Sequence, residues 1–410
     1  MRAMKHASRA ISLGVVLACV AGTMTLGIVQ KARCADGAWE GDEQYRYLCY
    51  SDVVPLVGTE QLAGGRLPFL DACRPSENNC DEYPVLTMYF MRVAAWGGGT
   101  GYAGFYYANA ILLTICAAAA AWCLWRLAGR RALWFALAPT LLLYGTMNWD
   151  VFAVALATAG LLAWATGHDE WAGILLGLGA AAKFYPALLV LPLFLQGMRD
   201  REPDRSVRIL WWSAGTWIVV NLPFAIAGPL AWMEFFRFNA ERVADWDSLW
   251  NIAASVWPAA TFRTGVINVA SAVAFASAVA LLWRLKIRRE PGFHRWTLGF
   301  PILLAFLITN KVYSPQYGLW LLPWFVLALP SFWAYSLFQA ADVAVFLTRF
   351  RFFGAYAGEP WGWPQSWFQI AVVVRTVVLL GCLVVWLRAE TRPLLARRHD
   401  AHPRLARVPA

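Results

Sequence analysis

Two short acidic motifs in the first hundred residues carry side chains that could serve as general bases. Asp52 stands two residues after Tyr50, and the pair Asp81 and Glu82 stands directly before Tyr83. A carboxylate between aromatic and apolar neighbours can accept a proton from a reacting hydroxyl group. A single loop carboxylate is more often solvated or caps a helix, so the motifs alone leave all three as candidates.

Two isolated lysines are the next residues with chemical potential. Of the 35 basic residues only five are lysines, and Lys183 and Lys311 each interrupt a long apolar stretch. Interrupted helices in membrane proteins often border a binding site. A buried ammonium requires a counter-anion. For Lys183 two partners stay open: the carboxylate of Asp150, or the phosphate of a lipid.

The composition indicates the kind of scaffold that positions these residues. The chain has 410 residues, 60% of them hydrophobic and 15% charged, with 24 tryptophans and a mean hydropathy of +0.49. Soluble domains are about 45–50% apolar and about 25% charged. Apolar stretches of roughly 20 residues, the length that crosses a bilayer, recur along the chain. We therefore predict an all-α polytopic membrane protein and exclude a soluble globular domain, a disordered chain and a disulfide-rich miniprotein.

The apolar stretches predict helices over 11–29, 104–126, 132–147, 150–166, 208–229, 263–285, 332–348 and 367–388. The stretches 171–196 and 297–330 are each one crossing or a hairpin of two short helices. Short cytoplasmic loops carry an excess of Lys and Arg, and only the hairpin interpretation keeps the Arg-rich loops 199–208 and 284–295 in the cytoplasm. The prediction is therefore a bundle of about 12 transmembrane helices with both termini cytoplasmic.

This topology divides the chain into a transmembrane domain over 1–388 and a basic cytoplasmic tail over 389–410, in a bacterial plasma membrane. The first exported loop, 30–103, is large, acidic and expected to be catalytic. The net charge of +10 is explained by the basic cytoplasmic loops. It is therefore no evidence for nucleic-acid binding. No histidine falls on the exported side, so carboxylates must do the chemistry there, and we expect no metal and no cofactor; the histidines are His6, His168, His294, His399 and His402.

Four of the eight cysteines fall in the exported loop: Cys34, Cys49, Cys73 and Cys80. An oxidising compartment permits disulfides there. The pairing Cys34–Cys49 with Cys73–Cys80 needs the least loop closure, and unpaired thiols are the alternative. Two charges, Asp342 and Arg375, fall at similar depth within the last two predicted helices. We expect them to form an ion pair, with a catalytic or phosphate-binding role as the alternative.

A second exported loop, 230–262, is rich in aromatic residues. It forms either an amphipathic helix at the membrane interface, or a wall of the substrate site or the entry path for a lipid chain. The aromatic and charged residues are Trp232, Phe235, Phe236, Phe238, Trp246 and Trp250 with Arg237, Arg242, Asp245 and Asp247.

The motifs also carry a family resemblance. Asn148-Trp149-Asp150, Ala182-Lys183-Phe184-Tyr185-Pro186 and Asn310-Lys311-Val312-Tyr313-Ser314-Pro315-Gln316-Tyr317 resemble marks of glycosyltransferase family 87, and Tyr50-Ser51-Asp52 and Glu82-Tyr83-Pro84 fit the same picture. The family consists of bacterial, largely actinobacterial, mannosyltransferases that use polyprenyl-phosphate donors and have the GT-C architecture. The resemblance covers about 45–330.

The resemblance implies a mechanism. Asp52 matches the catalytic acidic position of the first exported loop, and would deprotonate an acceptor hydroxyl that attacks the sugar with inversion; Glu82 and Asp81 are fallback bases. The acceptor would be a lipid-linked or envelope glycan, and the sugar mannose. Cations would bind the donor phosphate, and polar and aromatic residues would bind substrate. The phosphate-binding candidates are Lys183, Lys311 and Arg237, and the substrate-binding candidates are Tyr50, Tyr83, Asn148, Asp150, Tyr185, Gln316 and Tyr317.

One departure leaves the acceptor open. Gln316 stands where family members of the phosphatidylinositol-mannoside pathway tend to carry histidine. The competing hypothesis is a transporter or flippase of lipid-linked sugars, because broken helices and intramembrane charges are common there too. A large acidic exported loop and the absence of a convincing internal repeat favour the enzyme. An inert envelope scaffold is the third possibility.

Overall fold

The apolar stretches of the sequence fold into a bundle of long helices. The computed structural model describes residues 11–37, 39–74, 80–99, 101–257 and 263–394, and within these ranges all regular structure is helical, without strands. The first half of the chain contains α1 (Leu13–Ala32), α2 (Glu43–Arg46), α3 (Val53–Thr59), α4 (Val85–Gly98), α5 (Tyr102–Ala128), α6 (Ala132–Ala136), α7 (Pro139–Tyr144), α8 (Asp150–Ala165), α9 (Asp169–Ala182), α10 (Tyr185–Leu188) and α11 (Val190–Arg199). The second half contains α12 (Pro203–Ala227), α13 (Pro229–Glu241), α14 (Leu249–Val256), α15 (Thr264–Arg289), α16 (Gly299–Thr309), α17 (Leu322–Leu327), α18 (Phe332–Tyr356) and α19 (Gln365–Arg388).

Several helices have the properties of membrane spans. In the described part of the chain five are long and apolar enough to cross a bilayer: Leu13–Ala32, Tyr102–Ala136, Pro203–Ala227, Thr264–Arg289 and Gln365–Arg388. Helices α12 and α15 expose large apolar side chains such as Trp211, Ile226 and Val269, as lipid-facing helices do. The chain is thus an all-helical membrane protein, as predicted. The other predicted crossings are helical but shorter or more charged, and remain predictions.

Prolines explain where the observed helices differ from the expected ones. The helix predicted over 132–147 is divided into α6 and α7 before Pro139, because proline disfavours helical geometry in the preceding residue. Both interrupted stretches break where the lysines stand: α9 ends at Ala182 before Lys183, and α16 ends at Thr309 before Lys311. After Lys311 the chain forms a 3₁₀ helix, Pro315–Leu321, which leads directly into α17.

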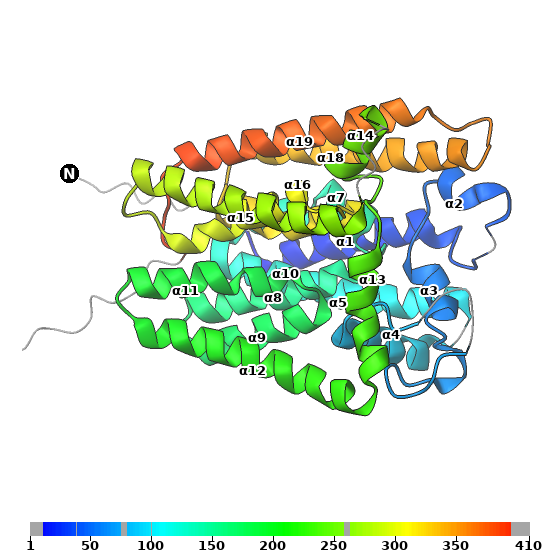
Figure 1. Ribbon diagram of the computed structural model, residues 1–410, viewed down its shortest axis with the longest axis horizontal. Helices are drawn as coiled ribbons and strands as arrows, with labels where there is room; N and C mark the ends of the chain where they lie inside the picture. The colour runs from blue at the N-terminus through cyan, green and yellow to red at the C-terminus, as the bar shows by residue number, and fades with distance from the viewer. Residues whose placement is uncertain (1–10, 38, 75–79, 100, 258–262, 395–410) are drawn as a thin grey trace, which may run out of the picture.

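Part of the predicted exported loop 30–103 is helical and packs into the bundle. Residues 85–98, which fall inside the predicted exported loop 30–103, form α4, and α4 packs against α5, α9 and α12. This segment joins the bundle because its side chains are mainly apolar. The part of the predicted loop before α4, residues 30–84, is called the polar region below. It holds α2 and α3 at one end of the bundle, on the right in Figure 1. Of the predicted tail 389–410, residues 395–410 lie outside the described residues.

Three sequence-based pairings are present in the structure. Cys34 is joined to Cys49 and Cys73 to Cys80. Arg375 Nη1 of α19 lies 3.4 Å from Asp342 Oδ1 of α18, and both side chains are fully buried. The ion pair therefore joins the last two long helices inside the bundle, as expected for opposite charges within membrane helices.

Helix α13 differs in direction from its neighbours. It lies across the long helices in Figure 1 and contacts α12 and α15. Gly228 forms the turn between α12 and α13, where any side chain would collide with the backbone oxygen of Phe69. The close approach that glycine permits brings α13 against the polar region that precedes α4.

Candidate functional site

A cavity of about 920 Å³ brings together helix ends that are far apart in the sequence. We call it the main cavity. Its wall includes residues that precede α3, α4 and α8, both interrupted stretches, the end of α13 and part of α18. Most of the predicted site residues line it: Asp52, Glu82, Lys183, Lys311, Tyr50, Tyr83, Asn148, Tyr185, Gln316 and Tyr317.

Asp52 is held by a hydrogen bond to each carboxylate oxygen. The hydroxyl of Tyr50 donates to Oδ1 at 2.7 Å, and the Nδ2 amide of Asn148 donates to Oδ2 at 2.8 Å. The backbone N–H of Asp52 donates to the carbonyl of Met147 at 2.9 Å. The polar region is thereby fixed to the segment before α8, and the carboxylate has one orientation toward the main cavity.

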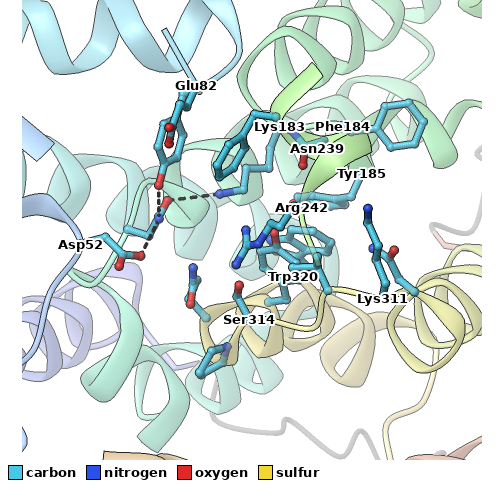
Figure 2. A pocket seen from close by; sticks show the side chains of 18 of the residues that line it. Asp52, Glu82, Lys183, Phe184, Tyr185, Asn239, Arg242, Lys311, Ser314 and Trp320 are labelled. Carbon is cyan, nitrogen blue, oxygen red and sulfur yellow. Dashed lines mark hydrogen bonds between the residues drawn. The ribbon is translucent and has the colours of Figure 1, made fainter. Parts of the chain in front are cut away.

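Asn148 connects this carboxylate to the first lysine. Lys183 Nζ donates to Asn148 Oδ1 at 3.2 Å, and the Asn148 amide also donates to the Tyr83 hydroxyl at 3.0 Å, as Figure 2 shows. Lys183 Nζ lies 3.2 Å from Asp150 Oδ2, so Asp150 is the counter-anion of this ammonium. Asp150 Oδ1 accepts from the indole of Trp320 at 2.7 Å. Asp150 thus lies behind Lys183 and does not line the main cavity.

Burial keeps the two tyrosines of this network in the hydroxyl form. The pKa of Tyr50 and that of Tyr83 are both raised well above the usual value, first by burial and then by the negative charge of Asp52. A neutral phenol can donate to a carboxylate, whereas a phenolate could not. The Tyr50 hydroxyl is therefore available as the donor to Oδ1 of Asp52.

Glu82 is a second carboxylate in the main cavity wall. It is half-buried, and burial followed by the nearby charge of Glu234 raises its pKa, while Arg242 opposes the increase. A higher pKa makes a carboxylate a stronger proton acceptor. Because Glu82 also lines the same cavity as Asp52, it remains the alternative base.

Two predicted site residues lie away from the main cavity. Asp81 is buried and accepts from both terminal nitrogens of Arg66, at 2.8 and 3.0 Å, beside the Cys73–Cys80 disulfide. The backbone of Asp81 has a positive φ of 68°. The side chain of Asp81 contacts Arg66, whereas that of its neighbour Glu82 lines the main cavity. Arg237 lies on the exposed side of α13, between Glu234 and Glu241. The structure gives Asp81 a scaffold contact and gives Arg237 surface ion pairs.

The structure places two further arginines in the main cavity wall: Arg349, which sequence reasoning missed, and Arg242, which it named only as part of the loop 230–262. Arg242 lies directly after α13, and Arg349 lies on α18. Arg349 forms ion pairs with Asp247 and with Asp245, the latter at 3.7 Å. The charged residues concentrated in 237–247, after the aromatic residues, were a signal that could have indicated Arg242. Which of these side chains faces the cavity, however, depends on where α13 ends.

The aromatic residues of α13 form one wall of the site. Phe235, Phe236 and Phe238 line the main cavity, so one of the two interpretations of the loop 230–262, a wall of the site, matches the geometry. Phe235 and Phe236 also line an adjoining cavity of about 430 Å³ between α9, α12 and α13, which we call the apolar cavity. Its wall is mainly apolar and includes Ala214 and Trp217 of α12.

Among the residues that the structure describes, the group of acidic and sulfur side chains close enough to share a metal ion lies outside the main cavity wall. It consists of Cys73, Cys80 and Asp81, and its two sulfurs are joined in a disulfide. A disulfide sulfur does not supply the thiolate that metals bind. This group is therefore part of the scaffold around Asp81.

Comparison with known proteins identifies a family. A sequence model of glycosyltransferase family 87 matches residues 82–309. The matched region includes Glu82, Asn148, Lys183 and Arg242, whereas Asp52 precedes it. Neither the curated proteins nor the solved structures contain a significant match.

Proposed function

The chain belongs to glycosyltransferase family 87, and from this premise we propose that it transfers a sugar from a lipid-phosphate donor to an acceptor hydroxyl in the main cavity. Asp52 is the general base of this proposal. The observation that carries it is the pair of hydrogen bonds that orient both oxygens of Asp52 at the cavity wall. A fixed base beside a bound substrate reduces the entropy that the reaction must lose.

The proposed step is a single displacement. Asp52 takes the proton of the acceptor hydroxyl while the acceptor oxygen forms a bond to the anomeric carbon of the sugar. The bond between that carbon and the phosphate oxygen breaks, and the phosphate leaves with the electron pair. Because attack and departure occur on opposite faces, the configuration inverts. Positive side chains near the departing phosphate stabilise the charge that develops on it.

A donor that combines a phosphate with a long apolar chain suits the shape of the site. The main cavity carries the charged residues, and the apolar cavity shares Phe184, Phe235 and Phe236 with it. Apolar walls favour burial of a hydrocarbon chain. Together with the family resemblance, this supports a polyprenyl-phosphate donor, with mannose as the sugar and a lipid-linked or envelope glycan as the acceptor.

We further propose that the bundle has the GT-C architecture with about 12 transmembrane helices, and that the main cavity faces the exported side of a bacterial plasma membrane. The support is chemical. Both disulfides fall in the polar region 30–84, and such bonds persist in oxidising compartments. That region also supplies Asp52, so the reaction occurs on the same side. No feature of the described residues favours the transporter hypothesis.

A transfer assay tests the proposed function. Membranes that contain the full chain receive labelled polyprenyl-phosphate mannose, arabinose or glucose together with a total envelope-lipid extract. We expect label from the mannose donor in a new glycolipid, and none with membranes that lack the protein. Absence of transfer from all three donors, with folded protein present, would reject the proposal.

A further inference from the structure

We propose that Arg242 and Lys311 together form the binding site for the phosphate of a lipid phosphate, and that Lys183 does not belong to it. The identity of the lipid as donor rests on the proposed function, but the anion site is argued from the charges alone. Four cationic side chains line the main cavity: Lys183, Arg242, Lys311 and Arg349.

Three of these four cations lie near a carboxylate, and two of them, Lys183 and Arg349, each pair with a carboxylate whose side chain is fully buried. Lys183 lies 3.2 Å from the buried carboxylate of Asp150. Arg349 contacts Asp247 and lies 3.7 Å from Asp245. Neutralised pairs attract a further anion weakly. Lys183 and Arg349 are therefore poor candidates for the main contact with a phosphate.

Within the described residues, Lys311 has no such counter-charge. It is only 5% exposed, and its Nζ donates one hydrogen bond, to the backbone oxygen of Ala240 at 3.1 Å. Among the residues that the structure describes, Lys311 forms no ion pair with a carboxylate. A buried ammonium without an anion is unfavourable, so this lysine has the capacity to bind an anionic ligand.

Arg242 lines the same cavity as Lys311. Its nearest carboxylate is Asp245, 3.4 Å away, and Asp245 also accepts from Ser314 and neighbours Arg349. The side chain of Arg242 is 33% exposed, and in the view of Figure 2 it lies between Asp52 and Lys311. The charges of Arg242 and Lys311 repel each other, and a phosphate between them would remove that repulsion.

The surroundings select a lipid phosphate over a free one. Arg242 directly follows α13, the helix whose Phe235 and Phe236 line both cavities. A ligand with its phosphate at Arg242 and Lys311 can therefore extend an apolar chain past these rings. A guanidinium is suited to phosphate because its N–H groups match two phosphate oxygens.

Ligand binding to the purified full chain in detergent tests this inference, with Asp52→Asn present throughout so that no transfer occurs. The probes are farnesyl phosphate, farnesol and inorganic phosphate. The variants are Arg242→Gln, Lys311→Met, Lys183→Met and, as a control, Arg263→Gln, whose arginine is exposed and outside the cavity wall. The melting temperature of each variant checks that it is folded.

We expect Arg242→Gln and Lys311→Met each to weaken farnesyl phosphate binding by about tenfold or more, because each removes a charge-assisted contact. Neither substitution should change the affinity for farnesol, because farnesol has no phosphate. Lys183→Met and Arg263→Gln should change farnesyl phosphate binding by less than about threefold. If Arg242→Gln fails to fold, Arg242→Lys replaces it, because this variant keeps the charge and should bind with intermediate affinity. If Lys311→Met fails to fold, Lys311→Gln replaces it.

Other results would overturn the inference. A large loss in Lys183→Met with none in Arg242→Gln would return the phosphate to Lys183. Equal affinity for farnesyl phosphate and farnesol would exclude an anion site, and equal affinity for inorganic phosphate would exclude the lipid part. These results do not depend on transfer: binding without transfer would reject the proposed function alone, and transfer with unaffected binding in both variants would reject the anion site alone.

Discussion

The Nδ2 amide of Asn148 donates to Oδ2 of Asp52 at 2.8 Å, although the two residues are 96 positions apart. The same asparagine accepts from Lys183 through its Oδ1. One side chain thus links the candidate base, on the polar region, to the first interrupted helix. Position and orientation of Asp52 therefore depend on contacts that no local motif contains.

The first prediction concerns the other donor to Asp52. Tyr50→Phe keeps the ring but removes the hydroxyl that donates to Oδ1 at 2.7 Å. A hydrogen bond to a charged group contributes about 1.5–3 kcal/mol, so we expect kcat to fall roughly 10- to 100-fold with little change in KM. The control is Tyr47→Phe, because Tyr47 is 39% exposed and outside the cavity wall. Equal kcat values in the two variants would contradict an orienting role for Tyr50.

Asp81 should matter for stability and not for the chemical step. Asp81→Asn breaks a buried pair with Arg66, in which the side chains are 1% and 7% exposed. Breaking such a pair costs about 3–5 kcal/mol. We expect a lower melting temperature and less folded protein, with nearly normal kcat per folded molecule. A variant that keeps its melting temperature but loses kcat would instead identify Asp81 as the base.

Glu60 gives the protein a defined pH dependence of stability. This carboxyl is fully buried, and burial raises its pKa from 4.5 to about 8. Between these values the folded state binds a proton that the unfolded state has released. Glu60 therefore lowers stability as the pH rises through this window, by about 1.4 kcal/mol per pH unit, and has no further effect above about pH 8.

Melting temperatures between pH 5 and 9 test this prediction. Glu60→Gln keeps an oxygen that can accept from the backbone N–H of Asp81, as Glu60 does at 2.6 Å, but cannot ionise. We expect the variant to lose less stability than the wild type between pH 5 and 8, and Glu40→Gln, at an exposed position, to behave as the wild type. Parallel curves for all three proteins would show that Glu60 ionises normally.

The apolar cavity should determine how the enzyme responds to chain length. Ala214→Trp places an indole in this cavity, whereas Val219→Trp adds one to an exposed position of α12. We expect Ala214→Trp to raise the KM for a long-chain polyprenyl donor by about tenfold, because lost burial of a few methylene groups has this effect. The KM for a donor with a very short chain should stay within about threefold. Unchanged KM values for both donors would place the chain elsewhere.

Much of the scaffold could be predicted from local patterns. Apolar runs predicted the long helices, and charges within them predicted the Asp342–Arg375 pair, because lipid and buried charge impose strict requirements. The breaks at Lys183 and Lys311 were also predictable, and both lysines line the main cavity. The direction of the chain at helix ends could not be predicted. Five residues along a helix correspond to about 140° of rotation, so choosing Arg242 over Arg237 required knowing where α13 ends and which face it presents.

The same limit applies to the carboxylates. Asp81 and Glu82 are neighbours in the sequence, yet one is paired with Arg66 and the other lines the main cavity. Glu60 stands at the end of the short helix α3. No pattern in the neighbouring residues predicts that its side chain is buried. Such differences arise from tertiary packing around the Cys73–Cys80 disulfide, which no pattern of residue types specifies.

The most direct test of the central claim compares turnover in Asp52→Asn and Glu82→Gln, with farnesyl phosphate affinity measured in parallel. Both substitutions keep the shape of a carboxylate that lines the main cavity. We predict that Asp52→Asn lowers kcat by about 10²- to 10⁴-fold and leaves the affinity unchanged, while Glu82→Gln retains most of the turnover. Nearly normal turnover in Asp52→Asn, with the loss in Glu82→Gln, would contradict the assignment of Asp52 as the base.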